Sequence, residues 1–229
     1  KLYGSIVLNN AVGGMNAEAV YAASLVADTP LIVWLPTINA EQFLKTNKYE
    51  IAPEWVADKS LKLKAAKDTK PVRVTKNGKL LPETNQVIQM LTQVKGVLAT
   101  GHIAWDESVL VAKYARRLGV PVIVTHPIYQ HIDMPVSIQK ELAAIGCMLE
   151  QSYSMYSMDG IPIANIAEQI RQVGVESVIL SSDVGQPFSP SPSDALVAFG
   201  KLLLAEGFTT SDLEQMLVFN PNSLLAARS

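Results

Sequence analysis

Short runs of consecutive apolar residues recur along the chain, each followed by a longer segment in which apolar residues repeat every three or four positions. A continuous apolar run, without polar alternation, is typical of a parallel strand that is covered on both faces. We therefore predict six strands, at residues 5–10, 30–36, 96–101, 120–125, 147–150 and 177–182.

The segments between these runs have the spacing of amphipathic helices. We predict helices at residues 15–27, 85–95, 106–118, 136–145 and 163–173, and two more at 194–205 and 212–217 after the last strand. Three of them run into a glycine, as helices commonly do: Gly96, Gly119 and Gly174. Repeated strand–helix units predict an α/β protein with a parallel sheet, either open and doubly wound or closed into a barrel.

Residues 39–84 interrupt this alternation and are richer in lysine. Within them, Asn77-Gly78 is a strong signal for a two-residue β-hairpin turn. We interpret residues 39–84 as an insertion after the second strand, with a small hairpin over one end of the sheet. In a barrel, insertions that follow strands lie on the catalytic face.

The composition is that of an ordinary globular protein, with 229 residues, 48% of them hydrophobic and 17% charged, and a formal net charge of −2. We interpret residues 1–229 as a single domain, with C-terminal helices in residues 206–229. The chain has no basic cluster that would indicate nucleic-acid binding, and its apolar runs are too short to span a bilayer. We expect a small-molecule substrate as the partner, neither nucleic acid nor membrane, and leave a homo-oligomer open.

The single cysteine, Cys147, excludes an intrachain disulfide and suits a reducing cytoplasm, where we expect the protein to be. Its apolar surroundings predict an inert buried thiol. The chain begins at Lys1 and runs into a strand almost at once, from which we expect a trimmed or incomplete N-terminus.

The predicted strands end on unusual polar residues. Two of the three histidines follow strands directly, at His102 and His126, and another strand runs into Asp183. The carboxyl ends of parallel strands are where ligands bind and chemistry is done in α/β proteins. Two imidazoles and a carboxylate suit a divalent metal, zinc in the first place, with manganese, nickel or iron as alternatives. A metal there lowers the pKa of a bound water to about 7, and Asp183 could take its proton and deliver it to a leaving group.

Other polar residues at the strand ends carry a weaker signal. Glu150 could contact metal or substrate, or form a salt bridge at the rim. His131 lies in the loop after His126, where a solvated loop or a supporting role beside a ligand is equally plausible. Asn9 and Asn10 could bind substrate or cap turns, and Gln186 is a further candidate for a substrate contact.

The motifs Ala99-Thr-Gly-His102, Thr125-His126-Pro127 and Ser182-Asp183-Val-Gly-Gln186 resemble, in order and placement, the amidohydrolase superfamily of metal-dependent TIM-barrel hydrolases, and within it a poorly characterised subgroup. This resemblance implies a (β/α)8 barrel in which His102 ends strand five, His126 strand six and Asp183 strand eight. The chain would then hold strands three to eight, with the insertion after strand four. The Asn-Pro start of a helix at Asn220 is also similar to this superfamily.

The resemblance further implies a His-x-His pair on the first strand, which would lie upstream of Lys1. The fourth strand runs into Trp34-Leu-Pro-Thr37, with no lysine or glutamate to bridge two metals, so one or two ions are both open. We expect metal-dependent hydrolysis of an amide, lactone or ester in a small molecule. The alternatives are a phosphoester hydrolase of a related barrel, which the lack of arginine and lysine at the strand ends disfavours, and a metal-binding barrel without turnover.

Overall fold

The computed structural model describes residues 3–27 and 30–226. All six predicted strands are present; five are shorter than predicted, and β7 continues two residues past its predicted end. They are β1 (Ser5–Val7), β2 (Ile32–Trp34), β5 (Val97–Ala99), β6 (Val122–Val124), β7 (Met148–Ser152) and β8 (Val178–Ser181). The expected start at Lys1 and the last three residues of the predicted C-terminal helices lie outside the described part.

The strands form one parallel sheet in the order β1-β2-β5-β6-β7-β8, so each strand pairs only with its neighbours along the chain. Because every strand runs in the same direction, all the carboxyl ends lie at one edge of the sheet. Within the described residues β1 and β8 are not hydrogen-bonded to each other. The parallel α/β fold is thus confirmed, and a closed eight-stranded barrel stays a prediction.

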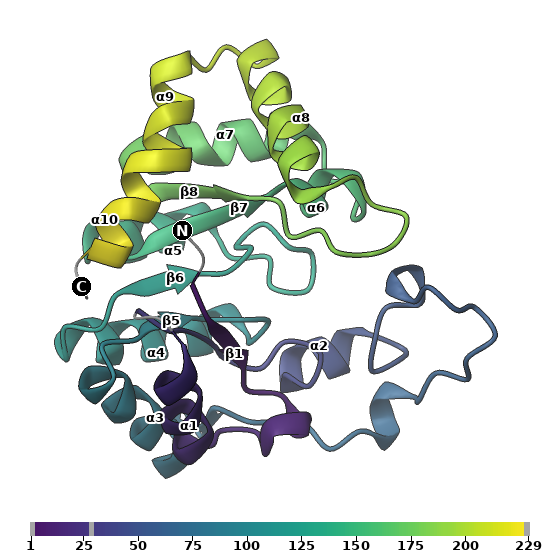
Figure 1. The fold of residues 1–229 in the computed structure, drawn as a ribbon, viewed down its shortest axis with the longest axis vertical. Helices are drawn as coiled ribbons and strands as arrows, with labels where there is room; N and C mark the ends of the chain where they lie inside the picture. The colour runs from purple at the N-terminus through teal and green to yellow at the C-terminus, as the bar shows by residue number, and fades with distance from the viewer. Residues whose placement is uncertain (1–2, 28–29, 227–229) are drawn as a thin grey trace.

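Helices follow the strands and cover the outside of the sheet, and Figure 1 shows α8 and α9 at one end of the molecule and α1 and α3 at the other. Among the described residues the longer helices are α1 (Ala17–Val26), α3 (Pro82–Gln93), α4 (Trp105–Arg117), α5 (Val136–Ala144), α7 (Ile163–Val173) and α8 (Pro192–Ala205). Short helices complete the set: α2 (Glu41–Thr46), α6 (Tyr153–Ser157), α9 (Thr210–Glu214) and α10 (Asn220–Ala226). None of the described helices has the length and hydropathy needed to cross a membrane.

In β5 and β6 the side chains on both faces are buried, which explains the continuous apolar runs. In β5, Leu98 belongs to the large core under the helices, whereas Val97 and Ala99 belong to a smaller cluster on the opposite face. Leu224 of α10 closes that smaller cluster. The start of α10 is fixed because Asn220 Nδ2 donates to the carbonyl oxygens of Val175 and Val178, at 2.7 and 2.6 Å.

The insertion contains the predicted hairpin, in which β3 (Thr75–Lys76) pairs with β4 (Lys79–Leu80). Asn77 and Gly78 form its two-residue turn with φ values of 51° and 71°. Its expected position over one end of the sheet is wrong, because the hairpin lies along α4, where Thr75 Oγ1 donates to Glu107 Oε1 at 2.7 Å. Other parts of the insertion, α2 and the 3-10 turn Pro53–Trp55, contribute side chains near the strand ends instead.

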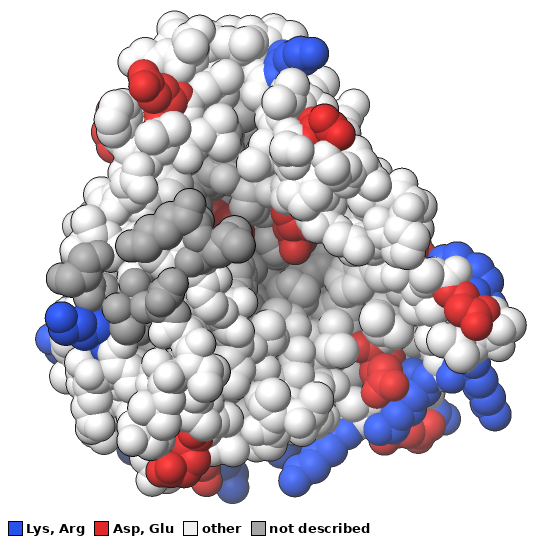
Figure 2. All heavy atoms as spheres, in the orientation of Figure 1, with Lys and Arg blue, Asp and Glu red and all other residues white. Residues whose placement is uncertain are grey.

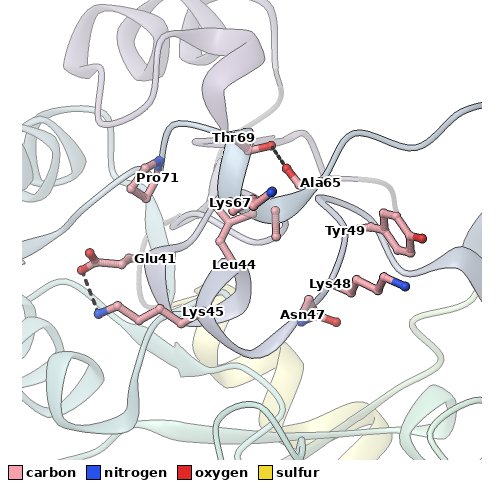
Figure 3. Close-up of a pocket in the computed structure, with 11 residues that line it drawn as sticks. Glu41, Leu44, Lys45, Asn47, Lys48, Tyr49, Ala65, Lys67, Thr69 and Pro71 are labelled. Carbon is pink, nitrogen blue, oxygen red and sulfur yellow. Dashed lines mark hydrogen bonds and ion pairs between the residues drawn. The ribbon is translucent and has the colours of Figure 1, made fainter.

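The insertion also encloses a cavity of its own, of about 610 Å³, between α2 and the 3-10 turn Ala66–Asp68. Figure 3 shows Lys45, Lys48 and Lys67 around it, with Lys45 paired to Glu41 at 3.4 Å. None of the strand-end residues singled out from the sequence lines this cavity. His102, His126 and Asp183 line a different cavity, at the edge of the sheet.

One glycine is required where β5 turns toward the site. Gly101 has φ +63°, and a Cβ on it would collide with the carbonyl oxygens of Leu35 and Pro36. The loop after β2 passes this closely because the His102 amide donates to the Pro36 carbonyl at 2.9 Å. The Gly101 amide in turn donates to Thr125 Oγ1 at 3.1 Å, which ties the end of β5 to the end of β6.

We predict that Gly101→Ala lowers the free energy of unfolding by more than the roughly 1–3 kcal/mol that left-handed strain alone costs a non-glycine residue. The matched control is Gly119→Ala, because Gly119 has a similar φ of +74° but nothing within 4 Å of an added Cβ. Urea unfolding of the two variants measures the difference. Equal losses would show that the close approach of the Leu35–Pro36 backbone has no energetic weight.

Candidate active site

A cavity of about 280 Å³ lies at the carboxyl ends of the strands. It brings together His102, His126 and Asp183 from β5, β6 and β8, together with Gln186 from the loop after β8. The space-filling view in Figure 2 shows a central hollow with acidic atoms in it, while most lysine and arginine atoms on this face lie toward the insertion. Among the described residues no lysine or arginine lines the cavity.

Two of these residues have strained backbones. His126 and Asp183 follow their strands with φ values of +42° and +47°, in the left-handed region that glycine usually occupies. This conformation turns the chain sharply at the end of the strand. A histidine or an aspartate in this conformation costs roughly 1–3 kcal/mol. The turn alone would favour glycine, so the side chains of His126 and Asp183 explain why these residues are present.

The two strained residues contact each other, with His126 Nε2 3.3 Å from Asp183 Oδ2. Each is also fixed by a serine. Ser152 Oγ lies 2.8 Å from His126 Nδ1 and 2.6 Å from Ser181 Oγ, and Ser154 Oγ donates to Asp183 Oδ2 at 2.8 Å. The imidazole is therefore oriented through both ring nitrogens.

Charges around His126 outweigh its burial. Burial by itself lowers the pKa of a histidine, but the carboxylates of Glu150 and Asp183 raise the pKa of His126 to about 9. Burial would likewise raise the pKa of Asp183, yet His126 and the hydroxyl of Ser154 hold it below its usual value. In the absence of another cation, the two side chains thus form an ion pair at neutral pH. The Asp183 side chain is 48% exposed, so the pair remains accessible from the cavity.

His102 behaves in the opposite way. It is buried, its ring stacks on Phe43 with the centroids 5.6 Å apart, and its centroid is 5.8 Å from that of His126. Burial, reinforced by the charge of His126, lowers its pKa to about 3, so the ring is neutral at physiological pH. Its Nδ1 is buried and has no hydrogen-bond partner among the described residues.

The donor set fits a divalent metal in chemistry and, in part, in geometry. Two ligand atoms about 2.1 Å from a tetrahedral zinc ion are about 3.4 Å apart, close to the separation of His126 Nε2 and Asp183 Oδ2. The unpartnered, neutral imidazole of His102 is a third donor of the right type. Nevertheless, within residues 3–27 and 30–226 no three His, Cys, Asp or Glu side chains already converge closely enough to hold an ion.

The position of Glu150 differs from the prediction. Strand β7 continues to Ser152, so Glu150 does not end its strand and does not lie on an exposed rim. It is 5% exposed, does not line the cavity, and lies 3.6 Å from His126 Nδ1 through an Oε2 atom that has no hydrogen-bond partner among the described residues. Its carboxyl group therefore lies behind His126 and away from the cavity, and burial raises its pKa although the charge of His126 acts in the opposite direction.

Asn9, Asn10 and His131, which were also singled out from the sequence, lie outside the cavity. Asn9 uses its amide to join two loops, because Oδ1 accepts from the Thr37 and Asn39 amides and Nδ2 donates to Thr37 Oγ1. Asn10 Nδ2 donates to the Lys70 carbonyl at 2.8 Å. These bonds tie together loops that are distant in the chain, and the roles of Asn9 and Asn10 as substrate contacts or turn caps stay predictions.

His131 forms a second layer behind His102. Its ring packs edge-on against Phe43 and Tyr129, at centroid distances of 5.9 and 4.8 Å. Those two rings also contact His102. His131 therefore supports the neighbours of His102 and does not reach the cavity.

Sequence reasoning missed the other walls of the cavity. Trp55 comes from the insertion, Met155 and Met158 come from α6 and its end, and Asp159 follows them. None of these residues ends a strand, so the pattern that identified the histidines could not identify them. A tryptophan in a lysine-rich insertion was the one available signal.

The three histidines should titrate separately in the metal-free protein. We predict that His126 titrates near pH 9, His131 below its usual value and His102 only at strongly acidic pH. Because the pKa of His126 is raised from 6.5, its ion pairs stabilise the fold fully below pH 6.5, and this contribution is lost as the pH rises through about 9. NMR titration of histidine-labelled protein in a chelator measures all three. A His126 midpoint at or below 6.5 would contradict the ion pair.

Comparison with known proteins places this fold among hydrolases of known structure. An amidohydrolase from Pseudomonas aeruginosa is 13% identical, with a TM-score of 0.55 over 86% of this chain and 64% of that one. A protein assigned as a 2-pyrone-4,6-dicarboxylic acid hydrolase from Pseudomonas putida is 12% identical, with a TM-score of 0.50 over 99% and 83%. A variant of the organophosphorus hydrolase from Deinococcus radiodurans is 17% identical, with a TM-score of 0.48 over 64% and 52%.

At these identities the likeness establishes the α/β fold, and the chain spans only 52% and 64% of the organophosphorus hydrolase and the amidohydrolase. The comparison with curated proteins gave no match. Residues 1–150 match a family model described as a family of unknown function, DUF6282. Since this match covers more than half of the 229 residues, the chain belongs to the DUF6282 family.

Proposed function

We propose that this protein is a metal-dependent hydrolase of a small molecule. The observation that carries the proposal is the contact between His126 Nε2 and Asp183 Oδ2 at 3.3 Å, beside the neutral His102, in a cavity at the carboxyl ends of parallel strands. The fold supports it, because structures of similar fold include proteins named as an amidohydrolase and a pyrone dicarboxylic acid hydrolase.

His102, His126 and Asp183 would hold the metal, with zinc as the first choice and manganese, nickel or iron as alternatives. When bound there, a divalent metal supplies Lewis acidity that activates water and polarises the bond to be cleaved. His126 is oriented for this role by Ser152, and the aromatic ring of Phe43 fixes the plane of His102.

Asp183 would act first as the general base and then as the general acid. Its low pKa keeps it ionised at neutral pH, and its exposed side chain can reach a water in the cavity. The hydroxyl of Ser154 holds one carboxylate oxygen in place. Gln186 uses its Oε1 to accept from the Gly185 amide and Ser189 Oγ, which leaves its Nε2 group to donate to a substrate oxygen.

The lining favours a carbonyl substrate over a phosphoester. Phosphate recognition generally uses arginine or lysine, and no such residue lines the cavity within the described part of the chain. An amide, a lactone or an ester has less charge to compensate. We therefore expect cleavage of a C–N or C–O bond next to a carbonyl group.

We predict that Asp183→Asn lowers kcat/KM by at least about 10²-fold while leaving the protein folded, with a lower thermal unfolding midpoint because one ion pair of His126 is lost. The measurement is a screen of the full-length protein, loaded with each of the four metals, against lactones, amides, carboxylic esters and phosphoesters. Asp68→Asn, an exposed carboxylate in the insertion, is the matched control. Full activity in Asp183→Asn would refute the mechanism, and turnover of phosphoesters alone would favour the related phosphoester hydrolase.

A second prediction concerns the residue that orients His126. Removing the hydroxyl in Ser152→Ala should weaken zinc binding about 10- to 100-fold, because the imidazole loses the partner that fixes its orientation. Competition with a chromogenic chelator measures the affinity, and Ser157→Ala, at an exposed position of α6, is the control. Unchanged affinity in Ser152→Ala would show that His126 is not a ligand oriented through Nδ1.

A further inference from the structure

Two polar atoms in the walls of the candidate active site have no partner. Trp55 Nε1 and Asp159 Oδ2 are buried, and neither makes a hydrogen bond to any described residue. Both residues line the same cavity as His102, His126 and Asp183. Buried polar groups in proteins are almost always paired, so each unpaired one needs an explanation. Here two residues that line one cavity carry an unpaired donor and an unpaired acceptor, and both atoms are closed to water.

These two residues do not belong to the His–Asp cluster. Trp55 comes from the insertion and packs its ring against Phe43, with the centroids 5.9 Å apart, and it thus lies on the side of His102. Asp159 comes from the segment between α6 and α7, and its backbone amide donates to the Ser154 carbonyl at 3.3 Å. The cavity wall therefore combines residues at the strand ends with residues from loops.

The charges around Asp159 disfavour the binding of an anionic compound beside it. Burial raises the pKa of Asp159, and the carboxylates of Asp183 and Glu54 raise it further, whereas the charge of His126 lowers it. The net result is a pKa of about 6. Lys59, in the same part of the insertion as Trp55, donates to the Pro53 carbonyl and lies over the ring of Phe188, and it does not line the cavity. Apart from His126, no cationic side chain in the part of the chain that the structure describes acts on Asp159 or lines the cavity.

Much of the remaining wall is apolar, with Trp34, Ile38, Met155 and Met158. The cavity volume of about 280 Å³ is just below the roughly 300–1,000 Å³ of small-molecule sites. Tryptophan faces attract rings and cations, and methionines fill irregular gaps around them. The occupant is therefore small, and part of its surface is apolar.

We propose that Trp55 and Asp159 form a recognition subsite that takes a small, uncharged or cationic, nitrogen-bearing ring compound. Trp55 Nε1 donates to an acceptor on this compound, and Asp159 accepts from its N–H group. This inference rests on the proposed function, which identifies the cavity as a catalytic site. It deepens that function, because it favours an amide with an N–H group over a lactone and disfavours substrates that carry a carboxylate. Asp159 acts here in binding, not in the chemical step.

The test uses three probes with the same ring and different charges: benzamidine, benzamide and benzoate. Isothermal titration of the full chain in a chelator measures their affinities, and the chelator prevents benzoate from binding through a metal. We expect benzamidine to bind at least about tenfold more tightly than benzoate, with benzamide between them, because a hydrogen bond to a charged group is worth about that much. In Asp159→Asn the preference for benzamidine over benzoate should fall below about threefold.

Matched variants separate recognition from shape. Trp55→Phe should weaken benzamide about three- to tenfold, whereas Trp34→Phe, which changes a wall of the same cavity without removing an unpartnered buried N–H, should weaken it less. Asp68→Asn is the control for the loss of a carboxylate and should leave all three affinities unchanged. Circular dichroism confirms folding, and if Asp159→Asn does not fold, the ranking of the three probes on the wild type decides alone.

The proposal is overturned if benzoate binds as tightly as benzamidine, if no probe binds, or if Asp159→Asn keeps the wild-type preference. Because the probes bind without metal and are not hydrolysed, these outcomes do not depend on turnover. A protein that binds the probes as expected but hydrolyses nothing would retain the subsite and lose the proposed function. A hydrolase without the expected ranking would do the reverse.

Discussion

The contact between His126 and Asp183 joins the ends of two strands that are not neighbours. Strand β7 lies between β6 and β8, so their backbones are roughly 9–10 Å apart, twice the spacing of adjacent strands. The side chains can meet only if β7 ends in residues that leave room for them. Ser152 at the end of β7 and Ser154 at the start of α6 do so, and their hydroxyls bind the two side chains that pass over them. Larger residues at these positions would separate the pair.

The same contact explains how two histidines in one cavity differ in charge. His126 has two carboxylates beside it, one of them buried behind the strand, and these hold a proton on its ring. That positive charge, added to burial among Phe43 and Tyr129, keeps His102 neutral. A divalent cation would replace the proton of His126 without leaving Glu150 and Asp183 uncompensated. The excess of negative charge in the metal-free site is consistent with a site built around a cation.

The sequence could predict those parts of the molecule in which a local residue pattern is combined with the regular pairing of parallel strands. His102, His126 and Asp183 each follow a continuous apolar run, and parallel pairing alone places such residues at one edge. Glu150 was misplaced because β7 continues through Gln151 and Ser152, whose polarity resembles the end of a strand although both are buried. The hairpin at Asn77-Gly78 was predicted correctly as a local turn, but nothing local specified that it packs on α4. Trp55 and Asp159 lie in loops without periodicity, so only the folded chain shows that they share a cavity.

The insertion contacts both a strand-end residue and a loop residue of the cavity, so the positions of these two residues cannot change independently. Phe43 of α2 packs against Trp55 on one side and stacks on His102 on the other. A change that moves α2 therefore alters the position of a candidate ligand and the position of a candidate substrate contact together. In a barrel whose loops only surround the site, specificity can change while the ligands at the rigid strand ends stay fixed. Here the candidate ligand His102 packs directly against Phe43 of α2, so in the proposed site substrate selection and ligand geometry depend on the same aromatic stack.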